Sequence, residues 1–441
     1  MSIKYTTTIY KNNKLKTVTR NTFFVKASHV EKRIINVFPE IRYQKIYGFG
    51  GAITDSAGYV YSLMSFKNKQ KLLKEYYSKD SMNYSLGRIH LDSCDFSTHK
   101  YQAIKSKDLD SMDITDTRKH IIPLIHDIQT YTGKPLEILA TPWSPPSFLK
   151  TTHLRTLGGK LKKSNMEFYA KYLCKYIQEL IKEDINITRI TIQNEPKAIQ
   201  TWDSCLYSAE EEKEFIKDYL YPELEKNHLE NIDILIHDHN KDSAYDRAKN
   251  VITEETKDII DGVAFHWYTG DHFDALSAIK DQYPDKDLIL SEMCVGYSKE
   301  DNVLKGQMYA HEYLGDLNHG ANALMDWNIL LDDKGGPNYV HNFCDAPFMY
   351  NKETEELNKR YTATYIWHFS HFIRPNAVRI GNTSYTNDLE VGSFLNDAGD
   401  IQIVILNKHN NKYTTNIKLD GKIAKIHIDK QSITTVSINY L

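Results

Sequence analysis

Residues 136–195 contain the segments LEILATPW (136–143), NMEFYAKYLCKYIQELIKED (165–184) and ITRITIQNE (187–195). The first and last are short apolar runs, which are typical of buried strands. The middle segment places its apolar residues at helical spacing. A strand, a longer helix and a second strand in this order predict one βαβ unit with parallel strands.

The same alternation recurs from about residue 46 to 373. A helix is also predicted over 208–227, where Ser208 precedes an acidic first turn, and another over 355–373. Because crossover connections are right-handed, eight βα units predict a closed (β/α)8 TIM barrel, an α/β fold, rather than an open sheet. The eight candidate strands are 45–54, 85–91, 136–143, 187–195, 232–240, 262–268, 287–293 and 321–329.

Both ends of the chain differ from this middle region. From about residue 377 the sequence shows short strands separated by turns, and the first 40 residues are also β-like. We therefore expect an accessory all-β sandwich built from both chain termini. The predicted division is 1–40 for its N-terminal strands, 41–374 for the catalytic barrel and 375–441 for the C-terminal part of the sandwich. The alternative is that residues 1–40 form an arm over the barrel floor.

Composition narrows the class of protein. The 441 residues carry 55 Lys and Arg against 58 Asp and Glu, a net charge of −3, which argues against an electrostatic nucleic-acid binder. No run approaches the roughly 18 apolar residues of a spanning helix, and the N-terminus lacks the apolar core of a signal peptide. The five cysteines include no CxxC pair. We expect a cytoplasmic protein without stable membrane insertion, disulfide framework or zinc ribbon.

Aromatic and polar residues follow several of the predicted strands. In a TIM barrel the carboxyl ends of the strands meet at one face, so these residues should gather in one site. Two glutamates on opposing strands suit the nucleophile and acid/base of a retaining glycosidase, and aromatic faces suit sugars. Any one of these residues alone could equally plug the barrel or form an ion pair. The set is Arg88, Asp95, Trp143, Asn194, Glu195, His266, Trp267, Tyr268, Glu292, Trp327 and Asn342.

A series of motifs in this region resembles glycoside hydrolase family 30, in particular its glucosylceramidase-type branch. They are GFGGAITDSAG (48–58), DSCDFS (92–97), TPWSPPSFLKT (141–151), QNEP (193–196), FHWY (265–268), SEMCVG (291–296) and DWN…GGPNYVHNF (326–343). The resemblance implies a barrel joined to a β-sandwich. It also implies that Glu195 is the acid/base, that Glu292 is the nucleophile and that Asn194 holds the sugar's 2-hydroxyl group.

The resemblance also assigns the residues around the two glutamates. Asp95, Trp143 and Trp327 match the sugar pocket, and Tyr268 matches the residue beside the nucleophile. With Asn194 and Asn342 these are the expected substrate-binding residues. Arg88, His266 and Trp267 are expected to support the site.

We therefore expect a retaining, exo-acting β-glycosidase that cleaves terminal β-glucosides of a carbohydrate or glycoconjugate, without a cofactor or metal. A β-xylosidase, β-fucosidase or β-1,6-glucanase with the same mechanism stays open. Two further alternatives are a metal-dependent hydrolase and a carbohydrate-binding protein that lost catalysis. The first would use His237, His239 and His266, since the first two alternate along one predicted strand.

Overall fold

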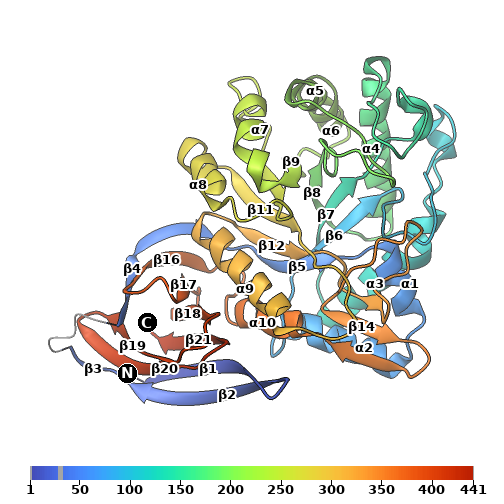
Figure 1. Ribbon diagram of the computed structural model, residues 1–441. Helices are drawn as coiled ribbons and strands as arrows, with labels where there is room; N and C mark the ends of the chain where they lie inside the picture. Colours follow the sequence, from blue (N-terminus) through green and yellow to red (C-terminus); the bar gives the residue numbers. More distant parts are fainter. Residues whose placement is uncertain (1, 28–32, 441) are drawn as a thin grey trace.

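The computed structural model describes residues 2–27 and 33–440. Eight parallel strands close into a barrel in the order β10-β11-β12-β5-β6-β7-β8-β9, which confirms the predicted (β/α)8 architecture (Figure 1). Each predicted strand segment contributes one of them. Their bounds are β5 Gly48–Ala52, β6 Leu86–Leu91, β7 Glu137–Pro142, β8 Ile187–Thr191, β9 Asp233–Asn240, β10 Gly262–His266, β11 Asp287–Glu292 and β12 Ala323–Asp326.

Helices surround the barrel strands on the outside (Figure 1). They are α1 Asp55–Ser62, α2 Phe66–Tyr77, α3 Thr115–Thr132, α4 Met166–Lys182, α5 Ala209–Phe215, α6 Tyr221–Lys226, α7 Ala244–Val251, α8 Phe273–Gln282, α9 Val303–Asn318 and α10 Tyr361–Ser370. Short 3₁₀ turns are η1 Leu109–Ser111, η2 Ser147–Leu149, η3 Lys163–Asn165 and η5 Lys241–Ser243. Strand residues buried inside the barrel form a cluster separate from the larger core between strands and helices.

Two predicted helices differ from the structure in detail. The segment 208–227 begins with a capping box between Ser208 and Glu211, as its sequence predicts, but the π-helical turn η4 Ile216–Leu220 divides it into α5 and α6. The helix predicted from residue 355 begins only at Tyr361, because β15 Glu356–Lys359 pairs with β14 Phe348–Asn351. Together with β13 Leu331–Asp332, these strands form a small sheet after the last barrel strand.

The two chain ends share one ten-stranded sheet in the order β2-β1-β21-β18-β17-β16-β4-β19-β20-β3. The N-terminal strand β1 pairs with the C-terminal strand β21, so the first strands belong to the sheet and are not an arm over the barrel. The division at residues 40 and 374 stays a prediction. The bounds are β1 Ser2–Lys11, β2 Lys14–Phe23, β3 Val25–Lys26, β4 Ile34–Lys45, β16 Val378–Ser384, β17 Glu390–Leu395, β18 Asp400–Asn407, β19 Tyr413–Leu419, β20 Lys422–Ile428 and β21 Ser432–Asn439.

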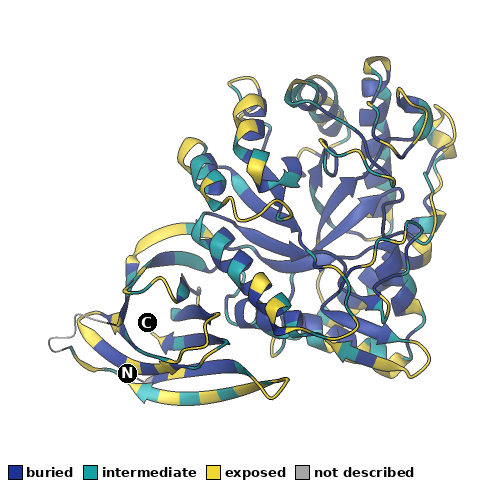
Figure 2. Ribbon diagram, viewed as in Figure 1, coloured by how far each residue is buried: buried dark blue, intermediate teal, exposed yellow. Residues whose placement is uncertain are grey.

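The sandwich has its own core and is fixed to the barrel through α9 and α10. Apolar side chains from its strands form a cluster distinct from that of the barrel. The strands β2 and β20 have exposed positions on their outer face (Figure 2), whereas β17, β18 and β21 are buried on both faces because α9 and α10 pack against them. On α10 the buried His368 contacts Thr8 of β1 and Thr435 of β21, each at 2.8 Å from a ring nitrogen. Burial lowers the pKa of His368 to about 3, so this contact is made by a neutral imidazole.

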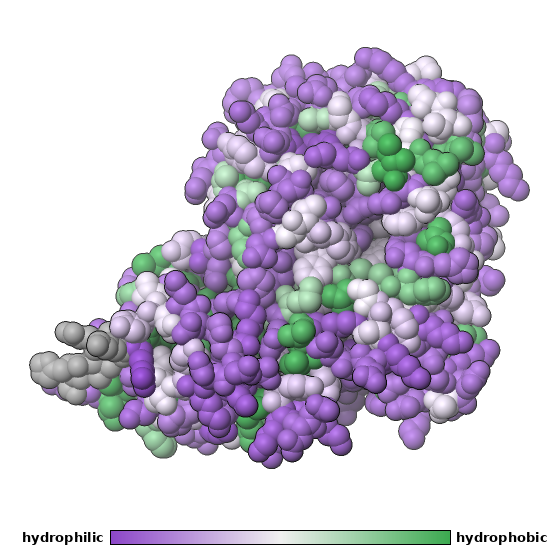
Figure 3. Space-filling view, viewed as in Figure 1, coloured by the Kyte–Doolittle hydropathy of each residue, from purple (hydrophilic) through white to green (hydrophobic). Residues whose placement is uncertain are grey.

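The surface in Figure 3 is largely hydrophilic, with exposed apolar residues in small separate groups. Among the helices of residues 2–27 and 33–440, none combines the length and apolarity of a membrane-spanning segment. All five cysteines, each in the described part of the chain, are free thiols.

Candidate active site

Glu195 and Glu292 face each other at the carboxyl end of the barrel. Glu292 is the last residue of β11, and Glu195 lies in the loop after β8. The backbone of Glu195 has a φ of 47°, a conformation that non-glycine residues seldom adopt, and its N–H donates to the carbonyl of Asp238 at 2.9 Å. One carboxylate oxygen of each glutamate lies within 4.8 Å of the other. An oxygen-to-oxygen distance of this size is compatible with the roughly 5–5.5 Å between the carboxyl groups of retaining glycosidases.

Both oxygens of Glu292 accept hydrogen bonds. Arg88 of β6 donates from Nη1 to Oε2 at 2.6 Å, and Tyr268 donates from Oη to Oε1 at 2.9 Å. Arg88 is completely buried and Glu292 is 8% exposed. Two donors, one of them charged, therefore fix the orientation of this carboxylate.

Glu195 is instead paired with His266, the last residue of β10, whose Nδ1 lies 3.3 Å from Oε1. Burial favours the neutral imidazole, but the carboxylates of Glu292, Asp238 and Glu195 outweigh it and raise the pKa of His266 to about 9. Burial also raises the pKa of Glu195, but the hydrogen bond and charge of His266 hold it below its ordinary value. The two side chains thus share a proton that rests on His266 in the free protein.

Asp238 of β9 lies beneath both glutamates, and the sequence did not single it out. It accepts hydrogen bonds from Arg88 at 2.9 Å, from Ser291 at 2.6 Å and from Thr191 at 2.9 Å, and its other partner is Nε2 of His266 at 3.1 Å. Although burial opposes ionisation, Arg88 and His266 hold the pKa of Asp238 far below its usual range. One buried carboxylate therefore orients the partners of both glutamates.

A β-bulge brings Asp238 into this position. Pairing between β9 and β10 shifts register between Ala264 and Phe265, which face His237 and His239. His237 and Asp238 both have positive φ angles, 77° and 45°. The extra residue breaks the simple alternation from which the sequence analysis placed the two histidines on one face. In the sequence, the only indication of this role of Asp238 is an aspartate between two histidines in an otherwise apolar strand.

Stacked aromatic rings and a buried carboxylate form the inner wall of the cavity. Trp143 and Trp327 lie 5.3 Å apart between centroids at an interplanar angle of 22°, and the Arg88 guanidinium lies 4.7 Å from the Trp143 ring centre. Asp95 accepts a hydrogen bond of 3.2 Å from Nδ2 of Asn342. Burial, followed by the charge of Glu292, raises the pKa of Asp95 to about 8, so Asp95 is largely protonated at neutral pH.

The cavity has a volume of about 530 Å³ and brings together all the predicted catalytic and substrate-binding residues. Arg88 and His266 lie beneath its floor, where both are completely buried. Trp267 lies behind the wall and donates from Nε1 to the carbonyl of Cys294 at 3.2 Å. His239, which the sequence analysis named only as a candidate metal ligand, also lines the cavity. The lining residues that the sequence analysis did not propose for any site are Ala198, Gln200, Trp202, Asn240, Cys294, Gly296, Phe343 and Cys344.

The three histidines proposed as metal ligands do not form one cluster. Among the described residues, the only group with metal-ligand spacing is Glu195, His266 and Glu292. His237 is buried, its Nε2 contacts the carbonyl of Asn240 at 3.0 Å, and burial lowers its pKa far below the usual range. A metal site here would therefore need a ligand set other than the predicted one.

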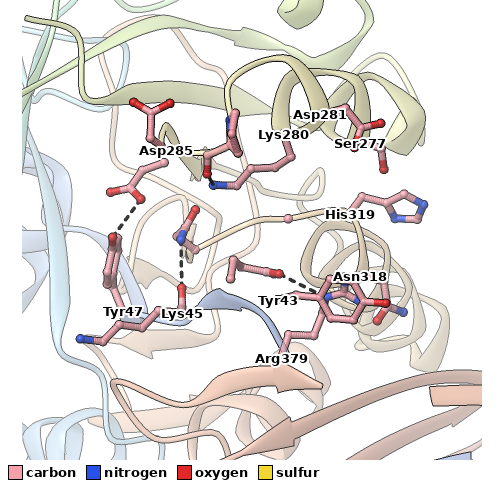
Figure 4. A pocket seen from close by; sticks show the side chains of 15 residues that line it. Tyr43, Lys45, Tyr47, Ser277, Lys280, Asp281, Asp285, Asn318, His319 and Arg379 are labelled. Atoms are coloured by element: carbon pink, nitrogen blue, oxygen red, sulfur yellow. Dashed lines mark hydrogen bonds between the residues drawn. The ribbon is translucent and has the colours of Figure 1, made fainter. Parts of the chain in front are cut away.

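A second cavity, of about 560 Å³, lies at the opposite end of the barrel, between β4, α8 and the segment before β12 (Figure 4). Tyr47 donates to Asp287 there at 2.9 Å, and the side chain of Asn322 donates to the carbonyl of Lys45 at 3.0 Å. It contains none of the predicted site residues and mixes acidic with basic side chains.

Comparison with known families agrees with the fold. Residues 46–373 match the model of the glycosyl hydrolase family 30 TIM-barrel domain, and residues 376–436 match that of the family 30 β-sandwich domain. The chain belongs to glycosyl hydrolase family 30. This family 30 protein is therefore an enzyme that hydrolyses glycosidic bonds in carbohydrate substrates.

Three relatives are similar to this family 30 chain over most of its length. Putative glucosylceramidase 4 of Caenorhabditis elegans is 31% identical over 83% of this chain and 75% of its own. The crystal structure of SrfJ from Salmonella typhimurium superposes with a TM-score of 0.96 at 33% identity, covering 100% of both chains. A solved endo-β1,6-glucanase superposes with a TM-score of 0.87 at 25% identity, covering 99% of both chains.

Proposed function

We propose that this enzyme is a retaining, exo-acting β-glycosidase that removes terminal β-glucosyl groups through a covalent glycosyl-enzyme. The observation that carries the proposal is the pair of glutamates with oxygens within 4.8 Å of one another and with different partners. Glu292, held by Arg88 and Tyr268, is the nucleophile. Glu195, which shares a proton with His266, is the acid/base.

The first step breaks the bond between the anomeric carbon and the leaving oxygen. Glu292 attacks the anomeric carbon, while the leaving oxygen takes the proton that Glu195 and His266 share. The resulting ester removes the negative charge of Glu292. Glu195 then accepts a proton from water, whose oxygen attacks the same carbon from the face opposite the ester and releases Glu292. Two inversions give net retention.

The shape of the cavity supports attack at a chain end. Trp143 and Trp327 are 1% and 3% exposed and close its inner end, where Asp95 and Asn194 offer hydrogen bonds to sugar hydroxyl groups. At the mouth stand Tyr268 and Phe343, which are 42% and 43% exposed. A blind inner end suits one terminal sugar, and the open aromatic mouth suits the group that leaves.

The relatives favour glucose as the sugar but differ in what is attached to it. One is named as a putative glucosylceramidase and another as an endo-β1,6-glucanase. The second name makes a β-1,6-glucanase the main alternative for this enzyme.

A panel of aryl β-glycosides with glucose, xylose or fucose tests the sugar, and we expect the glucoside to give the highest kcat/KM. A β-1,6-linked glucose oligomer tests the mode of attack. Release of glucose alone supports exo action, whereas internal cleavage into shorter oligomers favours the glucanase. NMR can show the anomeric configuration of the sugar that is released first. An α-configured sugar would exclude the retaining mechanism.

A further inference from the structure

Two thiols meet in the wall of the active-site cavity. Cys294 lies two residues after Glu292, Cys344 follows Phe343, and their Sγ atoms are 3.4 Å apart. The other three cysteines are buried and do not line this cavity, whereas Cys294 is partly exposed. A reagent that enters the cavity therefore reaches this pair before any other thiol of the chain.

The backbone holds the two thiols side by side. Gly296 and Cys344 form an isolated antiparallel bridge, and the N–H of Asp345 donates to the carbonyl of Val295 at 2.9 Å. A disulfide requires an S–S distance of about 2.0 Å, so the sulfurs need to approach by about 1.4 Å. Side-chain rotation and a small loop adjustment supply a movement of that size.

We propose that Cys294 and Cys344 form a modification site at which a low-molecular-weight disulfide, such as oxidised glutathione, is reduced while the two cysteines become a disulfide. One cysteine thiolate attacks the reagent's S–S bond, forms a mixed disulfide and releases one small thiol. The second thiolate then attacks the cysteine sulfur of that mixed disulfide and releases the second small thiol. Two electrons pass from the cysteines to the reagent, and the two cysteine protons end on the released thiols.

The new bond would disturb both sides of the catalytic site. Sγ of Cys294 lies 3.4 Å from Oη of Tyr268, which donates to Glu292. On the other side, the chain of Cys344 leads back through Phe343 to Asn342, whose amide donates to Asp95. Drawing the sulfurs together displaces groups beside the nucleophile and the sugar pocket. Because a displacement of about 1 Å can cost up to about 100-fold, we expect kcat/KM to fall about 10-fold to 100-fold.

The surroundings also set the pH at which this exchange proceeds. The contact with Cys344, burial and the charge of Glu292 raise the pKa of the Cys294 thiol, against a smaller opposing effect of Tyr268. Only the thiolate attacks, so the rate should rise about tenfold per pH unit while the pH stays below that pKa. The pair should thus stay reduced in brief exposure at neutral pH and react on longer exposure or at alkaline pH.

The experiment incubates the full-length protein with oxidised glutathione at pH 8.5 and then measures intact mass, a non-reducing peptide map and kcat/KM on an aryl β-glucoside. We expect a loss of two hydrogen atoms, a Cys294–Cys344 linked peptide, reduced kcat/KM, and recovery with dithiothreitol. Cys294→Ser and Cys344→Ser should each fail to form the link, whereas the buried-thiol control Cys174→Ser should form it as the wild type does. Thermal unfolding verifies the fold of each variant.

Two results would overturn the inference: a wild type that forms no Cys294–Cys344 link, or a linked protein with unchanged kcat/KM. The activity readout rests on the proposed glycosidase function, but the mass and the peptide map do not. If the reduced protein cleaves no glycoside, the proposed function fails, the peptide map still decides whether the thiols form the site, and binding of a glucose-configured inhibitor replaces kcat/KM as the second readout.

Discussion

Nη2 of Arg88 donates to Oδ2 of Asp238 over 2.9 Å, and both side chains are buried beneath the catalytic cavity. The same guanidinium holds Glu292 through Nη1. The other oxygen of Asp238 contacts His266, the partner of Glu195. Glu292 and Glu195, the proposed nucleophile and acid/base, are thus connected through a carboxylate that does not line the cavity, and this connection makes the protonation of Glu195 and His266 testable.

Replacing Asp238 by asparagine should shift the pH dependence of the enzyme. The negative charge of Asp238 helps to raise the pKa of His266 to about 9, so its loss makes the imidazolium release its proton at lower pH. The alkaline limb of kcat/KM, which reports the free enzyme, should move down by about 1–3 pH units. Ser291→Ala is the matched control, since it removes a hydrogen bond to Asp238 but leaves the charge of Asp238. The alkaline limb of kcat/KM of this control should stay near that of the wild type. A limb that does not move in Asp238→Asn would show that Asp238 only supports the fold.

Asp95 should make the stability of the protein depend on pH. Its pKa is about 8 in the folded protein against an ordinary value near 3.8, so the folded state binds the proton more tightly than the unfolded state. Its contribution to stability is complete below pH 3.8 and falls as the pH rises, by about 1.4 kcal/mol per unit until it levels off above pH 8. Asp95→Asn removes this dependence. The variant should therefore gain in Tm relative to the wild type between pH 5 and pH 9, and a constant difference would contradict the assignment.

The same protonation changes what Asp95→Asn should do to catalysis. Near pH 6 the protonated acid and the amide both offer a donor group and an acceptor oxygen, so kcat/KM should fall by less than about tenfold. Above pH 8 the wild type presents a carboxylate, and losing a charge-assisted hydrogen bond to a sugar hydroxyl should cost about 1.5–3 kcal/mol, or roughly 10-fold to 100-fold. An identical rate at every pH would indicate that Asp95 does not contact the sugar.

The sequence was sufficient for the barrel and for about half of the residues that line the cavity. The buried strands are apolar runs, and residues that directly follow such strands must reach the same barrel face. Glu195, Glu292 and Trp143 were therefore identifiable from their position alone. The start of the last helix was not, because β15 pairs with β14, and a local sequence pattern does not contain this pairing.

Asp238 and the thiol pair were missed for a related reason. The inward position of Asp238 depends on a bulge that appears only when β9 and β10 are paired. Cys294 and Cys344 lie in separate loops and meet through an isolated bridge. Residues brought together by irregular backbone have no periodic signal in the sequence, whereas residues at the ends of regular strands do.

Removing residues 1–40 should prevent folding. The deletion removes β1, which pairs with β21, and the first half of β4, which lies between β16 and β19 in the middle of the sheet. Apolar residues of the sandwich core and the contact of Thr8 with His368 are lost with it. We expect no cooperative thermal transition by circular dichroism. A folded, active Δ1–40 variant would refute the shared sheet.

The two glutamates should differ in how their loss affects the two halves of the reaction. Glu292→Gln should abolish turnover of every substrate, because no nucleophile remains to form the ester. Glu195→Gln should still form the glycosyl-enzyme from an aryl glucoside whose activated phenol leaves without a proton. Hydrolysis of that intermediate needs a base and should slow, so the burst of phenol release should be followed by a slow steady state. Azide, an anion that needs no base, should then accelerate turnover and yield the β-glucosyl azide.

His266→Asn tests the shared proton in the same assay. This variant should cleave substrates with poor leaving groups more slowly, relative to the wild type, than substrates with activated phenols. Azide should rescue His266→Asn less than it rescues Glu195→Gln. An α-azide from Glu195→Gln, or azide rescue of Glu292→Gln to a β-azide, would reverse the assignment of the two residues.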